Sequence, residues 1–164
     1  MTTIIWDPEK MSTGVPGVDA QHQEWIRRYN SFCDAITQGK GMEEVKRTLN
    51  FFIEYADTHF NYEEKVMAER HCRTAEANRA AHENMRQILA GFNGYVAQHG
   101  YSIMEMQGLR LQMEKWLINH ILNIDLGLRE TAGMSFDGVA TSPGVQGDSS
   151  KASILRMLLR LFKK

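Results

Sequence analysis

The chain has 164 residues, with 19 Lys and Arg, 20 Asp and Glu and 6 His, and a formal net charge of −1. With 43% hydrophobic and 24% charged residues, it has the composition of one globular domain with a modest extension, which excludes a wholly disordered chain and a collagen. Its two cysteines, Cys33 and Cys72, offer no disulfide framework and fit a reducing compartment. The opening residues lack a secretory signal and no apolar run is long enough to span a membrane, so we expect a cytoplasmic protein.

The near-neutral total hides an uneven distribution of charge. Residues 151–164 contain five of the basic residues and no acidic residue, so this tail carries +5 and residues 1–150 carry −6. A main domain with an acidic balance is unlike a general nucleic-acid binder. We therefore expect no nucleic-acid partner, and any basic contact surface is confined to the tail.

The chain opens on an arm and continues as a long stretch without proline. Residues 1–18 contain Pro8 and Pro16 together with two glycines, and we predict an extended N-terminal arm. From 19 to 132 there is no proline, and polar or glycine-rich breaks occur only at 39–41, 71–74 and 100. Long segments free of proline and separated by short breaks predict helices joined by short turns.

Four segments place apolar residues three or four positions apart, which is the pattern of a helix with one buried face. The four stripes run over residues 18–36, 45–66, 75–96 and 106–124, and Asp19 is the expected N-cap of the first helix. Four helices with short turns predict an all-α fold, an antiparallel up-down-up-down four-helix bundle that occupies residues 1–132.

Beyond the bundle, the composition changes twice. Residues 133–150 are rich in Gly, Ser, Thr and Asp and predict a flexible linker. Residues 151–164 alternate leucines and other apolar residues with arginine and lysine, which predicts a short basic amphipathic helix. Its candidate uses are binding to an anionic membrane surface, docking in a groove of a partner protein, or folding back on the bundle.

The inward stripes contain polar residues where apolar ones are expected. These residues are His22, His59, Glu63, Asn78, His82 and His120. A single buried histidine is commonly a satisfied core residue, but burial of several unpaired polar groups is costly unless they share a partner. Because facing helices of a bundle bring such groups to one level, we favour a metal site over ordinary core packing.

The donor set constrains the kind of metal site. His59 and Glu63 are four residues apart and project from the same helix face. Imidazole with carboxylate suits iron, zinc, copper or nickel, and two metals bridged by carboxylates use this many donors better than one tetrahedral zinc does. The Glu-x-x-His pairs of ferritin-like di-iron bundles do not occur. Asp125 follows His120 by five residues and joins the site only if its helix is distorted, for instance by a π-bulge, or if the ligand set spans more than one metal.

The sequence resembles the bacterial hemerythrins. The resemblance rests on Trp6-Asp7, Gly14-Val15-Pro16, Val18-Asp19-Ala20-Gln21-His22, His59-Phe60-Asn61-Tyr62-Glu63-Glu64 with Met67, and Trp116-Leu117-Ile118-Asn119-His120-Ile121 with Asp125. It covers residues 4 to about 132 and implies a four-helix bundle with a non-haem di-iron centre that binds O₂ reversibly for storage or delivery. The ligands carried over are His22, His59, Glu63, His82, His120 and Asp125, with Glu63 and Asp125 as bridging carboxylates. A ligand pocket of Trp25, Trp116 and Leu117 is expected to exclude water.

One position departs from the family pattern. The family has His-x-x-x-His in its third helix, whereas this chain has Asn78 four residues before His82. In the family, O₂ binds the iron that would here carry His22 and His59, so Asn78 affects the other iron. Because an amide oxygen is a weaker ligand than imidazole, we expect two irons with the second held loosely or completed by water.

Because Asn78 replaces an expected histidine, functions other than oxygen carriage remain as alternatives. Oxygen binding is not enzymatic, but an altered second iron favours a sensor of O₂, NO or peroxide, or weak oxidase or peroxidase activity. A third interpretation is a bundle without metal that only presents the tail to a partner. Iron analysis separates this last interpretation from the others.

Overall fold

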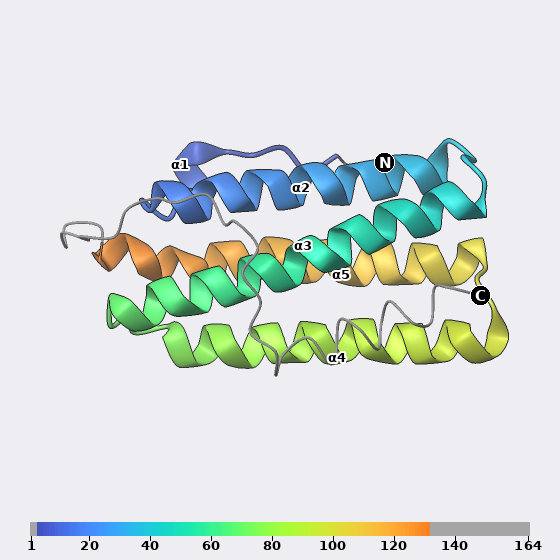
Figure 1. The fold of residues 1–164 in the computed structure, drawn as a ribbon. Helices are drawn as coiled ribbons and strands as arrows, with labels where there is room; N and C mark the ends of the chain where they lie inside the picture. Colours follow the sequence, from blue (N-terminus) through green and yellow to red (C-terminus); the bar gives the residue numbers. More distant parts are fainter. Residues whose placement is uncertain (1–2, 132–164) are drawn as a thin grey trace.

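A computed structural model describes residues 3–131 and shows an all-α bundle (Figure 1). Its four long helices are α2 (Pro16–Thr37), α3 (Met42–Glu69), α4 (Ala75–His99) and α5 (Ile103–Asn123). Each long helix packs against its neighbour in the chain, and α2 also packs against α5, which closes the bundle. The predicted fold class is confirmed. The predicted linker 133–150 and tail 151–164 lie outside the described residues.

The breaks between the helices lie where the sequence predicted them. Gly39 and Gly100 have φ angles of +63° and +80°, a left-handed conformation that glycine adopts without a steric penalty. His71, in the turn between α3 and α4, takes φ +50°. Helices α2, α3 and α4 therefore each end within two residues of a position whose backbone turns out of the helical path.

The N-terminal arm differs from the prediction because it is not extended throughout. It contains one helical turn, α1 (Pro8–Met11), where the Asp7 carboxylate accepts hydrogen bonds from the backbone N–H groups of Glu9 and Lys10. Before α1, the Asn30 amide exchanges hydrogen bonds with the N–H and the carbonyl of Ile4, at 3.1 and 2.8 Å. The arm is thereby fixed along α2, as Figure 1 shows.

The prediction that Asp19 caps the first long helix was wrong. The helix begins at Pro16 with Val15 as its N-cap, because proline is well suited to the first helical position, where no N–H is needed. Asp19 lies in the first turn and accepts hydrogen bonds from the Thr13 N–H and hydroxyl, both at 2.7 Å, and from the Ser12 hydroxyl at 2.6 Å. Its role is to tie the arm to α2.

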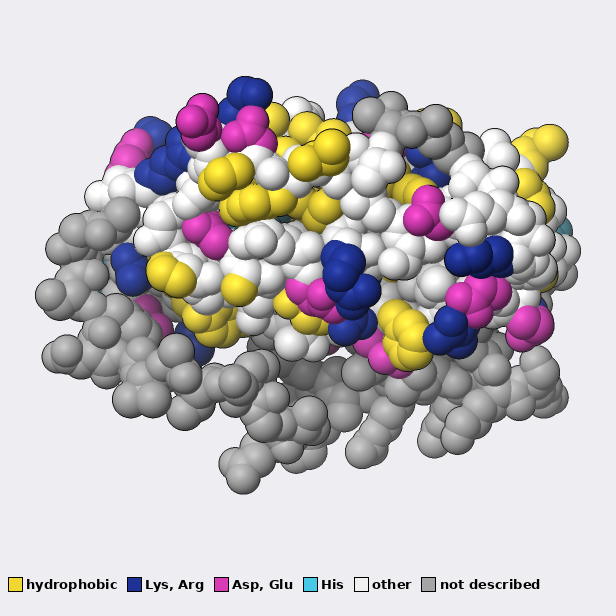
Figure 2. Space-filling model, turned by 90° about the horizontal axis from the view of Figure 1, so that it is seen from above, with side chains coloured by type: hydrophobic (Ala, Val, Ile, Leu, Met, Phe, Trp, Pro, Cys, Tyr) yellow, Lys and Arg dark blue, Asp and Glu magenta, His cyan; other side chains and the backbone are white. Residues whose placement is uncertain are grey.

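The stripes form one main core and a smaller cluster that contains Val18 and Val66. Every stripe residue of α2 and α3 is buried, whereas four positions of the other two stripes, Ala75, Phe92, Trp116 and Ile124, are only partly buried. On the face of the molecule in Figure 2, basic and acidic side chains lie beside one another, consistent with ion pairs such as Arg27–Glu24 at 2.6 Å. Over residues 3–131, no helix is both long and apolar enough to cross a membrane.

Candidate metal centre

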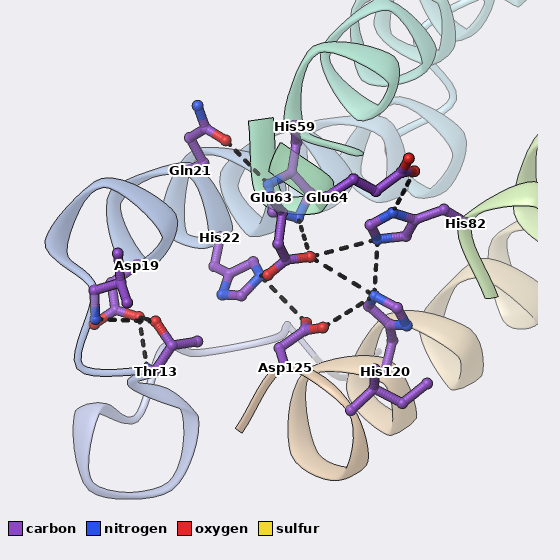
Figure 3. Close-up of polar contacts among 12 residues, drawn as sticks. Thr13, Asp19, Gln21, His22, His59, Glu63, Glu64, His82, His120 and Asp125 are labelled. Atoms are coloured by element: carbon purple, nitrogen blue, oxygen red, sulfur yellow. Dashed lines mark hydrogen bonds and ion pairs between the residues drawn. The ribbon is translucent and has the colours of Figure 1, made fainter. Parts of the chain in front are cut away.

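Four histidines, one from each long helix, meet inside the bundle. They are His22 of α2, His59 of α3, His82 of α4 and His120 of α5, and at most 3% of each residue is exposed. Figure 3 shows their rings turned toward a common centre. The 3–4 spacing explains this convergence, since each histidine occupies an inward stripe position at the same level of the bundle.

Glu63 lies at the middle of this cluster. Its Oε1 is 3.4 Å from His22 Nε2, and its Oε2 is 3.4 Å from His82 Nε2. The same Oε2 is 3.7 Å from His59 Nε2 and 3.9 Å from His120 Nε2. One fully buried carboxylate therefore faces all four histidines.

Asp125 joins the cluster, although its spacing from His120 does not fit a continuous helix. Its Oδ2 is 3.3 Å from His22 Nε2 and its Oδ1 is 3.1 Å from His120 Nε2. The expected distortion is present, but it is not a π-bulge. Helix α5 ends at Asn123, and Asp125 opens the 3₁₀ helix η1 (Asp125–Thr131), so the tighter winding turns the carboxylate inward.

The turn before α4 holds this helix end in place. The Thr74 hydroxyl donates a hydrogen bond to the Ile124 carbonyl at 2.9 Å, and the Gly127 N–H reaches the same carbonyl at 3.0 Å. Thr74 packs so closely on Gly127 that a Cβ at that position would overlap its side chain. A contact between residues 50 apart in the chain thus sets where Asp125 points.

The donor atoms fall into two overlapping groups. His22, His59 and Glu63 form one, and Glu63, His82 and His120 form the other, with the ligand atoms of each group within 4.8 Å of one another. Several of these buried atoms, including both oxygens of Glu63 and of Asp125, have no hydrogen-bond partner of good geometry. Buried polar atoms left unpaired are expected where cations complete them. The residues present therefore fit two neighbouring cations that share Glu63.

Comparison with known proteins agrees with this geometry. The model of the family "Hemerythrin HHE cation binding domain" matches residues 13–131. The chain belongs to the hemerythrin family. A bacteriohemerythrin from Pseudomonas aeruginosa is 27% identical over 128 residues, which are 77% of this chain and 80% of the relative. Bacteriohemerythrins from Methylococcus capsulatus and Stenotrophomonas maltophilia are 25% and 26% identical over 125 residues, 76% of this chain and 93% and 78% of theirs. No solved structure matches the chain significantly.

Hydrogen-bond partners orient two of the four histidines of this hemerythrin domain, His59 and His82. His59 Nδ1 lies 3.1 Å from Gln21 Oε1, and His82 Nδ1 lies 3.0 Å from Glu64 Oε1. Because both oxygens are acceptors, each Nδ1 donates a hydrogen bond and each Nε2 faces the centre, where it could ligate a metal once deprotonated. Arg86 holds Glu64 at 3.2 Å. Sequence reasoning assigned Gln21 and Glu64 no role, since no spacing rule connects them to histidines on other helices.

Aromatic rings cover the histidines of the hemerythrin centre. The centroid distances are 5.0 Å for Trp25 to His59, 4.2 Å for Trp116 to His120 and 3.9 Å for Phe60 to His82. Trp25 and Leu117 are fully buried, whereas Trp116 is partly buried. The predicted pocket residues Trp25 and Trp116 therefore border the histidines, Leu117 belongs to the adjoining core, and Phe60 is an addition that the sequence did not single out.

In the iron-free protein, several groups of the centre have pKa values far from their usual range. Burial alone lowers the pKa of His22, but Asp125 and Glu63 more than offset this effect and raise it to about 10. Burial lowers the pKa of His59 to about 3. For the Glu63 carboxyl, burial acts in the opposite direction and raises the pKa. The adjacent histidines nevertheless hold this pKa well below its usual range.

These shifts predict how the stability of the iron-free protein depends on pH. Between pH 6.5 and 10 the folded state keeps a proton on His22 that the unfolded chain loses, so stability falls as pH rises. Between pH 6.5 and 3 the unfolded chain protonates His59 and the folded state does not, so stability falls as pH drops. We expect the melting temperature of chelator-treated protein to peak near pH 6.5 and to decline toward pH 9. Iron loading should flatten the alkaline decline, because the metal replaces the proton; a flat iron-free profile from pH 7 to 9 would contradict the pairing of His22.

Proposed function

We propose that this protein binds O₂ reversibly at a non-haem di-iron centre and stores oxygen or delivers it to oxygen-requiring enzymes. The observation that carries the proposal is Glu63, which lies within 3.9 Å of four histidines from four helices. A carboxylate in that position suits a bridge between two irons. Membership of the hemerythrin family, a family of non-haem iron-binding domains, supports the choice of iron.

The proposed ligands divide between the two irons. His22 and His59 would hold the first iron, His82 and His120 the second, and Glu63 and Asp125 would bridge them. The irons supply the redox chemistry of oxygen binding. The protein's own contribution is to fix the imidazoles through Gln21 and Glu64 and to keep water away with Trp25 and Phe60, both of which are fully buried.

A metal titration followed by exposure to oxygen tests this function. Ferrous iron is added anaerobically to the purified protein, and iron per chain is measured after removal of the unbound metal. We expect two irons per chain and a new visible absorption band on exposure to O₂ that disappears when the oxygen is removed. Failure to retain iron, or irreversible oxidation with no reversible band, would contradict the proposal.

A second candidate function uses the same centre for sensing, or for reaction with peroxide or NO. The observation that favours it is Asn78, which is fully buried with both amide atoms unpaired at the position where the resemblance led us to expect a ligand. Repeated turnover of peroxide by the iron-loaded protein would separate this function from oxygen carriage.

The tail, residues 151–164, leads to a separate proposal about location. We propose that the protein is cytoplasmic and that its +5 tail holds it at an anionic membrane surface, with a partner protein as the alternative target. Co-sedimentation with anionic vesicles, with and without residues 151–164 and at low and high salt, tests this. If removal of the tail changes nothing, the membrane proposal is wrong.

A further inference from the structure

Asn78 is a buried polar residue to which the proposed ligand set gives no role. It lies near the start of α4, is fully buried, and donates its backbone N–H to the Thr74 carbonyl at 2.8 Å. Neither Oδ1 nor Nδ2 of its side chain has a hydrogen-bond partner. An unpaired buried amide lowers stability unless something in the functional state pairs with it.

Two contacts between α4 and the α5 end of the bundle fix the level of Asn78. Four residues before it, Thr74 bonds the Ile124 carbonyl at 2.9 Å, and four residues after it, His82 Nε2 lies 2.9 Å from His120 Nε2. Asn78 is therefore bracketed by these contacts, at the level where Asp125 meets His120. Since residues four apart share a helix face, Asn78 lies on the inward face with His82.

The length of the side chain decides what the amide can reach. A carboxamide is shorter than an imidazole, so from the same helix face it ends short of the point that His82 Nε2 reaches. Around the other metal position, His59 is flanked by the His22 ring at 4.8 Å, the Trp25 ring at 5.0 Å and Gln21, whose carbonyl oxygen already pairs with Nδ1. An unpaired amide is thus placed beside the second donor group.

We propose that the metal held by His82 and His120 keeps an open coordination position beside Asn78, and that the Asn78 amide donates a hydrogen bond to a small anion bound there. The inference rests on the proposed di-iron centre and adds a second ligand position to it. A bound anion would accept the Nδ2 hydrogen bond and pair a donor that is otherwise left without a partner. Hydrogen bonds of this kind to a charged acceptor are stronger than those between neutral groups.

Azide binding to the ferric protein tests the proposal, with the azide stretching band as the readout. Asn78→Ala keeps the position open but removes the donor, so we expect the stretching frequency to shift and affinity to fall about tenfold. Asn78→His fills the position with imidazole, so we expect the band that responds to Asn78→Ala to disappear. Azide bound at the other metal would give a band that neither variant changes.

Asn93 provides a matched control on the same helix. It is 2% exposed and both of its amide atoms are also unpaired, but it lies about four turns beyond Asn78 and away from the histidines. Asn93→Ala should leave azide affinity and the stretching band unchanged. Unaltered azide binding in both Asn78 variants would overturn the inference, as would an equal effect of Asn93→Ala.

Iron analysis of each variant distinguishes a failure of the proposed function from a failure of the inference about Asn78. If the wild-type protein retains no iron, the proposed function fails and the inference fails with it. If the wild-type protein and both Asn78 variants each retain two irons and bind azide alike, only the inference about Asn78 fails.

Discussion

Replacing Glu63 with glutamine is expected to remove most of the bound iron while leaving the fold intact. Glu63 belongs to both donor groups, so its loss would affect both proposed metals at once. Neutral glutamine has nearly the same shape but offers no negative charge to two adjacent cations. We expect iron affinity to fall by roughly 100-fold or more. This loss is larger than the loss expected when a residue that only hydrogen-bonds to a ligand is changed. Iron per chain after dialysis measures the effect, and circular dichroism reports the helical content.

Two other glutamates of α3 provide graded controls for this experiment. Glu64→Gln weakens only the support of His82, so we expect a smaller loss of affinity, about 10–100-fold. Glu69 is exposed and pairs only loosely with Lys65, at 3.7 Å, so Glu69→Gln should have no effect. If Glu63→Gln retained iron as well as Glu69→Gln does, a bridging role for Glu63 would be wrong.

The helical part of this site could be predicted because helix periodicity fixes it. Once His22, His59, Glu63, His82 and His120 occupy inward stripe positions, the bundle has no other place for them than its interior, and the structure buries all five. The glycines themselves located the breaks near Gly39 and Gly100. Within a regular helix, the spacing along the chain is sufficient to decide which face a residue occupies.

Contacts between elements could not be predicted in the same way. Gln21 and Glu64 adjoin candidate ligands in the chain, but each supports a histidine on a different helix, 38 and 18 residues away. Asp19 has the character of an N-cap, yet the residues before it compete for its carboxylate, and Pro16 starts the helix earlier. In these cases the hydrogen-bond partner of each side chain depends on which residue the tertiary packing brings closest. The local sequence pattern does not specify that residue.

The position of Asp125 is set by a tertiary contact and does not follow from helix periodicity. On a continuous helix it would point well away from His120, and only the resemblance to hemerythrins indicated that it belongs to the site. In the structure, the helix ends at Asn123 and Thr74 bonds the Ile124 carbonyl just before Asp125. The position of this proposed ligand therefore depends on a residue of a different turn, which is itself not a candidate ligand.

This dependence predicts that Gly127→Ala weakens iron binding without touching any candidate ligand. The new Cβ would overlap the Thr74 side chain, so either Thr74 or the 3₁₀ turn must move, and Asp125 moves with the turn. We expect the free energy of unfolding to fall by about 1–3 kcal/mol, as for other overpacked sites, and iron affinity to fall with it. Chemical denaturation of the iron-free protein and iron titration measure the two effects separately.

Substitutions at Gly108 and Thr74 serve as controls for the Gly127→Ala experiment. Gly108 lies within α5 with open space around it, so Gly108→Ala should raise stability by about 0.5–1 kcal/mol and leave iron affinity unchanged. Combining Gly127→Ala with Thr74→Ala relieves the overlap but removes the hydrogen bond to Ile124, so stability should recover in part while iron affinity stays low. If Gly127→Ala instead behaved like Gly108→Ala, the contact with Thr74 would not be what holds Asp125 at the centre, and the helix end alone would have to account for its position.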